Sequence, residues 1–437
     1  MMRVAVIGAG IAGVTAAHAL ASQGHHVTVY ERRSSVAAEA SFAQLGLVAP
    51  SLTGPGPFDG APPLTERGGR WGLRPEAHLR PGWDTAAWRW LWQARQAVAP
   101  SRRAAAHKSL GELARYGQQH LRKVVVGHKL DYERAEGHLV LLSRSSQLSE
   151  AQQSLLELKA RGIEARVLDP TACRVIEPAL PLNANIAGGL YLPNDEVGNC
   201  RQFAHLLKEV AERMGVEFRF STEVIEVMPG ERPSLRSITL QSTTAFMSSR
   251  HVAAAREAAR DAREAYDAVL LCAGVQAAPL LQQLGLRLPL LPVYGYSITA
   301  SLRDLDRGPR AAVTDAQHGV SIARLGQRVR VAGGIEIGTA AHEHHEARLR
   351  PLYQALDRWF PGSAQKNHAQ AWKGATPALP DGMPVLGQSD APGVWLNLGH
   401  GTQGWALSCG AARLLADRIA GREPDLPLAA FELRRLR

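Results

Sequence analysis

The sequence contains little cysteine. Four cysteines are spread over 437 residues, and no two of them form a CxxC pair. Zinc sites and dithiol redox centres need closely spaced thiolates, so this spacing argues against both. We therefore predict no metal ion, and we expect all four thiols to be reduced and buried. The four are Cys173, Cys200, Cys272 and Cys409.

The sequence also lacks a long apolar run. No uninterrupted stretch approaches the roughly 20 residues that a helix needs to cross a bilayer, which argues against an integral membrane protein. The apolar run after Arg3 leads into a glycine-rich turn and has no small-residue cleavage site, so it indicates a strand rather than a signal peptide. We expect a cytoplasmic protein, with peripheral attachment to the inner face of the cytoplasmic membrane left open.

Positive charge is in excess, but it is not gathered in one place. The formal net charge is +10 and the pI is near 9.7, which favours contact with anionic surfaces. No block of lysine and arginine with interleaved aromatics occurs, so we do not expect nucleic-acid binding.

The composition, with 45% hydrophobic and 21% charged residues, is ordinary for a globular protein. The length exceeds what one core usually organises, so we expect two domains.

Four tryptophans gather in one short segment. This run suits a membrane interface or a quinone entrance, and an amphipathic helix packed against a neighbouring domain explains it equally well. The tryptophans are Trp83, Trp88, Trp90 and Trp92, and they stand beside Arg80 and Arg89.

The first motif is rich in glycine. Residues 8–13 read Gly-Ala-Gly-Ile-Ala-Gly between a β-branched run at 3–7 and an alanine-rich helical pattern at 14–23. A second strand pattern at 26–30 is followed by Glu31. Strand, glycine turn, helix, strand and acid occur in the order of a dinucleotide-binding βαβ unit, although an ordinary βαβ unit with a glycine-rich turn is the alternative.

The three motif glycines have different tasks in such a unit. Gly8 permits the tight turn, Gly10 lets backbone N–H groups approach a pyrophosphate, and Gly13 lets helix and strand pack closely. Glu31 can accept hydrogen bonds from the adenosine ribose, which disfavours NADP, but the motif alone does not separate NAD from FAD. The first predicted cofactor-binding residues are Gly8, Gly10, Ile11, Ala12, Gly13, Glu31 and Arg32.

A second glycine turn lies near the C-terminus, between a strand pattern at 394–398 and a helical pattern at 405–419. The chain ends before another strand with a ribose acid could follow, so a second dinucleotide site is not expected. The helix N-terminus could instead stabilise a reduced, anionic flavin. The predicted residues are Gly399, His400, Gly401, Thr402, Gln403, Gly404 and Trp405.

The remaining patterns alternate between helix and strand. Helical periodicity occurs at 85–98, 109–125, 148–161 and 203–214, and strand patterns occur at 217–220, 222–227 and 268–272. We expect an irregular connection at 51–71, a turn-rich segment at 188–200, a polar insertion up to 266, and an antiparallel sheet after 289. These patterns predict an α/β fold with a discontinuous Rossmann-like FAD-binding domain (1–85, 188–280 and 380–437). They also predict an α+β substrate domain built on the antiparallel sheet (86–187 and 281–379).

Together these segments resemble a known family. The two glycine turns, the segment 188–200, Tyr-Gly-Tyr-Ser at 294–297 and Pro-Asp-Gly-Met-Pro at 380–384 are similar to the D-amino acid dehydrogenase branch of the glycine/D-amino acid oxidase flavoproteins. The resemblance covers nearly the whole chain. It implies FAD, oxidation of an amine carbon beside a carboxylate to an imine, and hydrolysis of that imine to a 2-oxo acid and ammonia.

The resemblance also implies further cofactor-binding residues. One loop would lie along the pyrophosphate and flavin, one backbone position would meet the adenine, and one strand end would pass near the dinucleotide. Gln44 stands where the family usually has Asn, and the flavin attachment positions carry no family-type Cys or His, which implies noncovalent FAD. The implied residues are Ser41, Gln44, Gly46, Val224, Cys272, Ala273 and Gly274.

One departure from the family concerns the substrate carboxylate. The family reads Gly-Leu-Arg-Pro before its Pro-Asp-Gly turn, and that Arg pairs with the carboxylate, whereas this sequence has Thr376 in its place. A hydroxyl supplies neither the charge nor the fork of a guanidinium. Arg324 is a candidate substitute, with a solvated charge on the sheet as the alternative. Thr376 would otherwise suit a neutral or bulky substrate group.

Two tyrosines are candidate substrate-binding residues. Tyr294 and Tyr296 lie on one strand, and we expect them not to face the same pocket unless a bulge intervenes. Either one orients the substrate or both pack in the core with satisfied hydroxyls. The cluster at 342–346, His-Glu-His-His-Glu, lacks metal-ligand spacing and indicates the polar start of a helix.

These observations favour an FAD-dependent dehydrogenase that takes a hydride from the carbon of a deprotonated amine onto flavin N5 and passes the electrons to a quinone or another acceptor. No obligatory catalytic side chain is predicted, because positioning and stabilisation of the reduced flavin suffice. Two alternatives stay open: oxidation of a secondary amine or modified amino acid, and a flavin-holding subunit of a larger complex.

Overall fold

A computed structural model describes residues 1–53, 77–79, 84–97, 100–239, 260–338 and 346–436 of the chain. Its α-helices are α1 (Ile11–Ala21), α2 (Thr85–Ala97), α3 (Pro100–His128), α4 (Ser145–Ala160), α5 (Pro170–Ile176), α6 (Cys200–Arg213), α8 (Ala278–Gln283), α9 (Glu346–Trp359) and α10 (Gly404–Ile419). Short 3₁₀ turns include η1 (Pro50–Leu52) and η6 (Gly401–Gln403).

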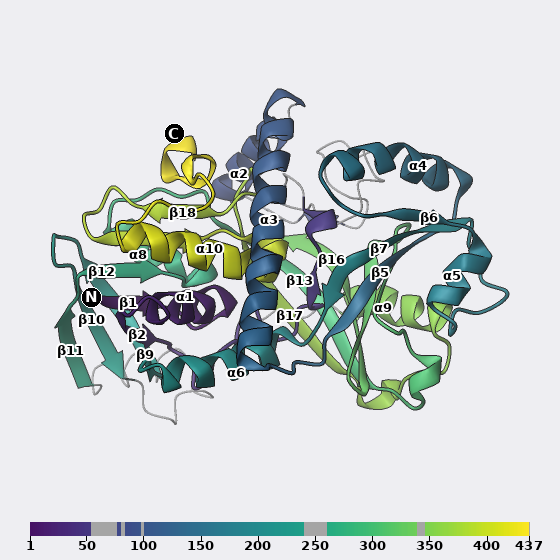
Figure 1. The fold of residues 1–437 in the computed structure, drawn as a ribbon, viewed down its shortest axis with the longest axis horizontal. Helices are drawn as coiled ribbons and strands as arrows, with labels where there is room; N and C mark the ends of the chain where they lie inside the picture. The colour runs from purple at the N-terminus through teal and green to yellow at the C-terminus, as the bar shows by residue number, and fades with distance from the viewer. Residues whose placement is uncertain (54–76, 80–83, 98–99, 240–259, 339–345, 437) are drawn as a thin grey trace.

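The described strands form three sheets. In chain order they are β1 (Arg3–Ile7), β2 (His26–Tyr30), β3 (Leu47–Val48), β4 (Ala77–Leu79), β5 (Ala135–Leu142), β6 (Arg166–Leu168), β7 (Gly188–Val197), β8 (Glu217–Arg219), β9 (Thr222–Met228), β10 (Ser234–Thr239), β11 (Arg260–Ala265), β12 (Ala268–Leu271), β13 (Leu291–Ser301), β14 (Ala312–Asp315), β15 (Val320–Leu325), β16 (Arg328–Ile337), β17 (Gln370–Ala378), β18 (Val385–Gln388) and β19 (Val394–Leu398). Figure 1 shows β1 and β12 on one side of the molecule and β5, β7, β13 and β16 on the other, with α3 between them.

The first sheet carries the glycine-rich turn at residues 8–13, which we call the glycine cradle. Its order is β18-β19-β12-β1-β2-β8, and every pair except β18 with β19 is parallel. On β1, Val4 and Val6 pack under α1, α6 and α10, whereas Ala5 and Ile7 pack in a second core together with residues of β9 and β12. A parallel strand covered on both faces needs apolar residues throughout, which explains the continuous run in β1.

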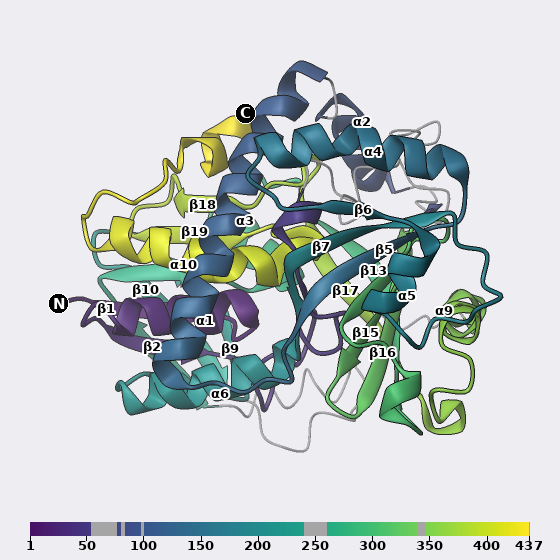
Figure 2. The ribbon, with the colours of Figure 1, turned by 45° about the vertical axis from the view of Figure 1, so that its right-hand side comes forward.

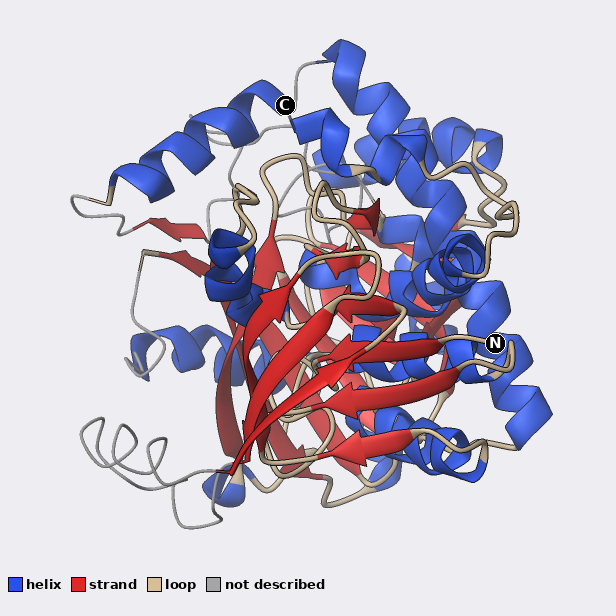
Figure 3. Cartoon of the chain, turned by 90° about the vertical axis from the view of Figure 1, so that its left-hand side faces the viewer, coloured by secondary structure: helices blue, strands red, loops and turns tan. Residues whose placement is uncertain are grey.

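The second large sheet has ten strands. Its path is β17-β13-β16-β15-β14-β5-β7-β3, with β4 beside β16 and β6 beside β7. On one face, Ile298 and Val331 pack with Leu352 and Trp359 of α9. Figure 2 shows β5, β7, β13 and β16 of this sheet together, on the other side of the molecule from β1 and β2. Figure 3 shows the strands gathered in the middle of the molecule, with helices around them.

The long helix α3 crosses α10 at a pair of glycines. A Cβ on Gly117 would lie 2.3 Å from the carbonyl oxygen of Ala406, and one on Gly410 would lie 2.9 Å from the Cα of Gly117. The two backbones therefore touch, and Leu110 and Leu113 of α3 join the core of the first sheet. This close approach ties α3 to the first sheet, although the sequence patterns predict that residues 86–187 belong to the substrate domain.

Several expectations can be compared with these elements. The α/β fold with a second, mainly antiparallel sheet is confirmed. The turn-rich prediction for 188–200 is wrong, because residues 188–197 form β7, whose Leu190 and Leu192 are buried in the ten-stranded sheet. The polar insertion includes strand β11, which pairs with β10 despite its charges. Residues 54–71 of the irregular connection, 240–259 of the insertion, Trp83 with Arg80, and the histidines at 342–345 lie outside the described residues.

Two further expectations concern the cysteines and membrane-spanning helices. The four cysteines are free and buried, as expected. No described helix has the length and apolar character needed to cross a membrane.

The buried His18 predicts how stability depends on pH. Its imidazole lies between α1 and α3 with Nε2 3.1 Å from Nε2 of His128, and burial, followed by the charge of His128, lowers its pKa from 6.5 to about 4. Because the folded pKa lies below the unfolded one, the unfolded chain takes up the proton first. The free energy of unfolding therefore falls as pH drops from 6.5 toward 4, by about 2 kcal/mol at pH 5 for this group.

Urea unfolding at pH 7.5 and pH 5 of wild type and His18→Gln would measure this contribution. The variant should lose less stability between the two pH values than wild type does. His26→Gln is the control, because His26 is exposed at the start of β2. Equal losses in wild type and His18→Gln would contradict the assignment.

Candidate functional site

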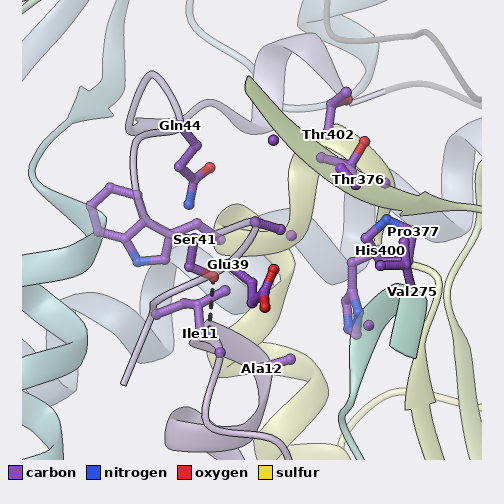
Figure 4. A pocket seen from close by; sticks show the side chains of 18 of the residues that line it. Ile11, Ala12, Glu39, Ser41, Gln44, Val275, Thr376, Pro377, His400 and Thr402 are labelled. Atoms are coloured by element: carbon purple, nitrogen blue, oxygen red, sulfur yellow. Dashed lines mark hydrogen bonds between the residues drawn. The ribbon is translucent and has the colours of Figure 1, made fainter. Parts of the chain in front are cut away.

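A cavity of about 680 Å³ lies between the first sheet and the ten-stranded sheet. The β1–α1 turn, the ends of β2 and β12, the loop at 38–49, strands β9, β13, β16 and β17, and the turn before α10 all contribute to its wall. Figure 4 shows side chains from these distant segments pointing into one space. Almost every residue predicted from the sequence for cofactor or substrate lies in this wall; the exceptions are Gly13 and Arg324.

The β1–α1 turn can exist only with glycine at two positions. Gly8 has a φ of +102°, and a Cβ there would lie 2.8 Å from the carbonyl oxygen of Cys272. A Cβ on Gly13 would lie 1.8 Å from the carbonyl oxygen of Gly8, so Gly13 supports the turn from behind rather than lining the cavity. At Gly10, the N-cap of α1, a Cβ would meet only Ser41 Oγ at 3.6 Å, so this position opens into the cavity.

The N-terminus of α1 is available to an anion. The N–H of Ile11 donates to Ser41 Oγ at 3.1 Å, which is the dashed line in Figure 4. The free N–H groups and the positive end of the helix dipole favour a negatively charged group such as a pyrophosphate. Asn397 holds the turn from below, because its Nδ2 donates to the carbonyl of Ala12 at 3.3 Å.

Glu31 stands where β2 enters the cavity. Its carboxylate accepts hydrogen bonds from the N–H groups of Ala9, at 2.7 Å, and Arg33, at 2.8 Å. Burial raises its pKa, and the two backbone donors partly oppose that rise. Arg32 pairs with Glu39 at 2.6 Å, and Glu39 also lines the cavity. No sequence motif points to Glu39, because it lies in an irregular loop.

Residues 41–46 are held between the two sheets. Ser297 Oγ of β13 donates to the carbonyl of Ala43 at 2.7 Å, and Arg330 Nη1 of β16 donates to the carbonyl of Gln44 at 2.8 Å. Burial lowers the pKa of Arg330 to about 10. Gly46 closes the loop with a φ of +93°, and a Cβ there would lie 2.0 Å from the carbonyl oxygen of Gly198. The contribution of Arg330 was missed, because nothing local distinguishes it from other arginines on a sheet.

The turn before α10 forms the opposite wall. Gly399 and Gly401 have φ values of +78° and +57°, and His400 bridges to Ala378 of β17. Gln403 Nε2 donates to the carbonyl of Leu52 at 3.4 Å, which joins this turn to η1. The N-terminus of α10 therefore points at the cavity, where its dipole can stabilise a negative charge.

His400 is a buried, neutral imidazole in this wall. Burial lowers its pKa to about 4, and its Nε2 has no hydrogen-bond partner among the described residues. A neutral imidazole offers either a donor or an acceptor, depending on its tautomer. It can therefore hydrogen-bond a ligand without adding a positive charge.

Thr376 lies in the wall on the same side as His400 and Thr402 (Figure 4). Its Oγ1 donates to the carbonyl of Val293 at 3.0 Å, so the hydroxyl is committed to the neighbouring strand. Arg324, the predicted substitute cation, does not line the cavity, and its Nε donates to the carbonyl of Gly326 at 3.1 Å. Around Thr376, the described wall therefore offers no guanidinium or ammonium group to a carboxylate.

The two tyrosines lie together. Both line the cavity and both rings pack around Lys373, whose Nζ lies 4.4 Å from the ring centroid of Tyr294 and 5.7 Å from that of Tyr296. The expectation allowed both to face one pocket only where a bulge intervenes, and the pairing of β13 with β16 does shift its register between them. Residues two apart on a regular strand also share a face. Tyr296 donates to Glu336 at 2.6 Å, and Glu336 pairs with Lys373 at 3.3 Å. The register shift beside them lies on β16.

Within the described residues, no group of three or more His, Cys, Asp or Glu side chains is arranged to hold a metal ion. The cavity is lined mostly by apolar side chains and backbone. Its geometry suits a long ligand with an anionic centre at α1 and a polar ring system at α10.

Comparison with known proteins agrees with this geometry. A model of the DAO family, described as FAD dependent oxidoreductase, matches residues 3–418. A D-amino acid dehydrogenase of Bradyrhizobium diazoefficiens is 34% identical over 439 residues, covering 99% of each chain. One of Cereibacter sphaeroides is 36% identical and covers 99% of this chain and 95% of the relative.

Solved structures share the fold at lower identity. Glycine oxidase from Geobacillus kaustophilus superposes with a TM-score of 0.73 at 19% identity, covering 99% of both chains. L-proline dehydrogenase from P. horikoshii superposes with a TM-score of 0.70 at 15% identity, covering 99% of this chain and 97% of the other.

The open space at Gly10 predicts a substitution that separates folding from cofactor binding. Gly10→Ala places a methyl group beside Ser41 without a clash, so the thermal stability of the FAD-free protein should be unchanged. The same methyl group would intrude where the pyrophosphate approaches the backbone, so FAD affinity should fall by about tenfold or more. A fluorescence titration of FAD into the apoprotein measures the Kd.

Gly127→Ala, at a helical position with nothing within 4 Å of the added Cβ, is the matched control and should bind FAD like wild type. An unchanged Kd in Gly10→Ala would show that the pyrophosphate does not lie at this turn.

Proposed function

The chain belongs to the DAO family of FAD-dependent oxidoreductases, and on that premise we propose that it is a dehydrogenase that oxidises the C–N bond of a D-amino acid to an imine. The imine then hydrolyses to a 2-oxo acid and ammonia. The observation that carries this proposal is the similarity to D-amino acid dehydrogenases over nearly the full length of both chains, at 34–36% identity. The comparisons do not favour the alternatives of a secondary-amine oxidase or a flavin-holding subunit.

The residues in the cavity wall fit FAD. The glycine cradle and the α1 N-terminus would hold the pyrophosphate, Glu31 the ribose, and Val224 the adenine through its backbone. Ser41, Gln44 and Gly46 would lie along the pyrophosphate and flavin, and the turn at 399–405 would flank the isoalloxazine. When bound, FAD supplies the acceptor for the hydride that leaves the substrate carbon.

The protein's own contribution is positioning and electrostatics. The α10 N-terminus stabilises negative charge at its end of the cavity, and the apolar wall excludes water. His400 is neutral above pH 4, so it adds a hydrogen bond without competing with the helix dipole. Tyr294 and Tyr296 form part of the wall, with the buried Lys373 behind them.

The FAD is proposed to be held noncovalently. Cys272 is the cysteine that lines the described cavity, and burial raises the pKa of its thiol to about 12, which keeps it protonated and poorly nucleophilic. Precipitation with acid should therefore release all of the flavin into the supernatant. Yellow colour that stays with the pellet would contradict noncovalent binding.

A quinone acceptor and peripheral contact with the inner face of the cytoplasmic membrane complete the proposal. On α2, Trp88 and Trp92 lie one turn apart and are 45% and 57% exposed, next to the exposed Arg89. Exposed tryptophans beside a cation suit the surface of an anionic bilayer. Co-sedimentation with phosphatidylglycerol vesicles should decrease in the double variant Trp88→Ala/Trp92→Ala, and equal binding would contradict this contact.

Product analysis tests the activity. Purified protein with D-alanine and an artificial electron acceptor should form pyruvate and ammonia in equal amounts, one of each per two electrons delivered. Turnover by the chain alone also excludes the flavin-holding subunit. No product from any member of a panel of D-amino acids would contradict the proposal.

Thr376 predicts how substrate affinity can be improved. Thr376→Arg would introduce a bidentate partner for the carboxylate, so the KM for D-alanine should fall by about tenfold. Thr376→Met, similar in length but uncharged, is the control and should not lower the KM. Equal effects of Arg and Met would show that the carboxylate does not bind beside position 376.

A further inference from the structure

Behind the cavity wall lies a chain of buried polar side chains to which the flavin chemistry assigns no role. It starts at Ser321 of β15, which lines the cavity. Ser321 Oγ lies 2.7 Å from Thr314 Oγ1, and Thr314 Oγ1 lies 2.7 Å from His138 Nε2. His138 Nδ1 lies 3.5 Å from Asp195 Oδ2, and the same oxygen accepts a hydrogen bond from Ser51 Oγ.

The chain is shielded from solvent except at its start. His138 has no exposed surface, Asp195 is 3% exposed, Ser51 2% and Thr314 4%, whereas Ser321 is half-buried at the cavity. Its members come from β15, β14, β5, β7 and η1, so five separate elements meet to build it. Burying a histidine and a carboxylate together is costly unless they interact, so this arrangement is not a by-product of packing.

The hydrogen bonds can all run in one direction. Ser51 donates to Asp195. Nδ1 of His138 makes no hydrogen bond within the described residues, and the carboxylate of Asp195 lies 3.5 Å from it, which favours the tautomer with its proton on Nδ1. His138 Nε2 is then an acceptor for the Thr314 hydroxyl, and Thr314 is in turn an acceptor for the Ser321 hydroxyl. The lone pair left on Ser321 Oγ faces the cavity. A chain polarised in this way accepts a proton at its open end.

A positive charge lies near Asp195, the carboxylate at the buried end of the chain. Arg161 donates to the carbonyls of Pro50, at 3.4 Å, and Thr53, at 3.0 Å, on either side of Ser51, and its positive charge interacts with Asp195. The other carboxylate close in sequence, Asp315, is engaged elsewhere with His318, Arg358 and Trp359. Asp195 is therefore the charged group beside His138, and Arg161 is the cation that interacts with Asp195.

From this geometry we propose that Ser321, Thr314, His138 and Asp195 form a proton relay that deprotonates the ammonium group of the substrate, a role that rests on the proposed function. The substrate N–H bond breaks and its proton passes to Ser321 as the Ser321 proton passes to Thr314 and the Thr314 proton to His138 Nε2. The lone pair stays on the substrate nitrogen, and no electrons are transferred. Asp195 stabilises the resulting imidazolium, and His138 later returns the proton to cavity water.

The substrate must lose a proton before the hydride can leave. An amino acid reaches the enzyme at neutral pH as an ammonium ion, which has no lone pair to assist departure of the hydride. The cavity wall near Thr376 offers no carboxylate to take the proton directly. Ser51, which bonds Asp195 at the buried end of the relay, lies next to the turn before α10, because Gln403 of that turn donates to the carbonyl of the neighbouring Leu52.

The test measures the rate of anaerobic flavin reduction by D-alanine in stopped flow, at pH 7 and at a pH above the substrate ammonium pKa of roughly 10. Thr314→Val keeps the shape of the side chain and interrupts the chain, and His138→Gln removes the acceptor. Both variants should lose about tenfold or more in rate at pH 7 and regain the wild-type rate at high pH, where the amine arrives deprotonated. Thr53→Val, whose hydroxyl bonds the carbonyl of Ala49 beside the relay, is the matched control.

Two further measurements separate a relay from a structural role. The double variant Ser321→Ala/Thr314→Val should lose no more rate than the worse single variant, because one chain is interrupted once. FAD content and Tm of each variant are measured in parallel and should match wild type. Wild-type rates in the variants, or a loss that persists at high pH, would overturn the relay alone. Absence of flavin reduction in the wild type would overturn the proposed function, and the relay with it.

Discussion

The structure depends on how residues 41–46 are held between two sheets. Ser41 accepts from the α1 N-terminus on one side, and Ser297 and Arg330 of the ten-stranded sheet donate to the loop carbonyls on the other. Gly46 closes against Gly198 at a distance that no side chain permits. These contacts fix the separation of the sheets and so create a cavity that one long dinucleotide can bridge. Arg330 is buried, and a charged donor makes its hydrogen bond to the Gln44 carbonyl a strong one.

The two ends of the cavity suit different parts of the ligand. At α1 the helix dipole, Glu31 and Arg32 suit the adenosine diphosphate part of FAD, whereas at α10 a helix N-terminus and the neutral His400 suit the ring system. The described wall beside Thr376 has no guanidinium group. Two charged groups lie behind the cavity wall: the Lys373–Glu336 pair behind Tyr294 and Tyr296, and Asp195 at the far end of the chain through His138.

Much of the fold was predictable because its signals are local. Residues 8–13 and Glu31 follow a spacing that the backbone itself requires, and parallel strands buried on both faces read as apolar runs. The hydrogen bonds that hold the loop at residues 41–46 could not be predicted, because Ser297 and Arg330 lie 254 and 286 residues from their partners in the sequence. The glycine, proline and asparagine of segment 188–200 indicate turns, yet tertiary pairing makes most of it an interior strand. The relay could not be predicted for the same reason, because its four members share no sequence pattern and come from four different strands.

The central claim is that this chain holds FAD and reduces it with electrons from a D-amino acid. Anaerobic mixing of the purified holoprotein with D-alanine and, separately, with L-alanine tests it most directly, because the flavin absorbance near its visible maximum reports its redox state. The flavin should bleach with D-alanine or other D-amino acids and should stay oxidised with the L-enantiomers. A flavin that stays oxidised with every D-amino acid, or that bleaches equally with both enantiomers, would contradict this claim.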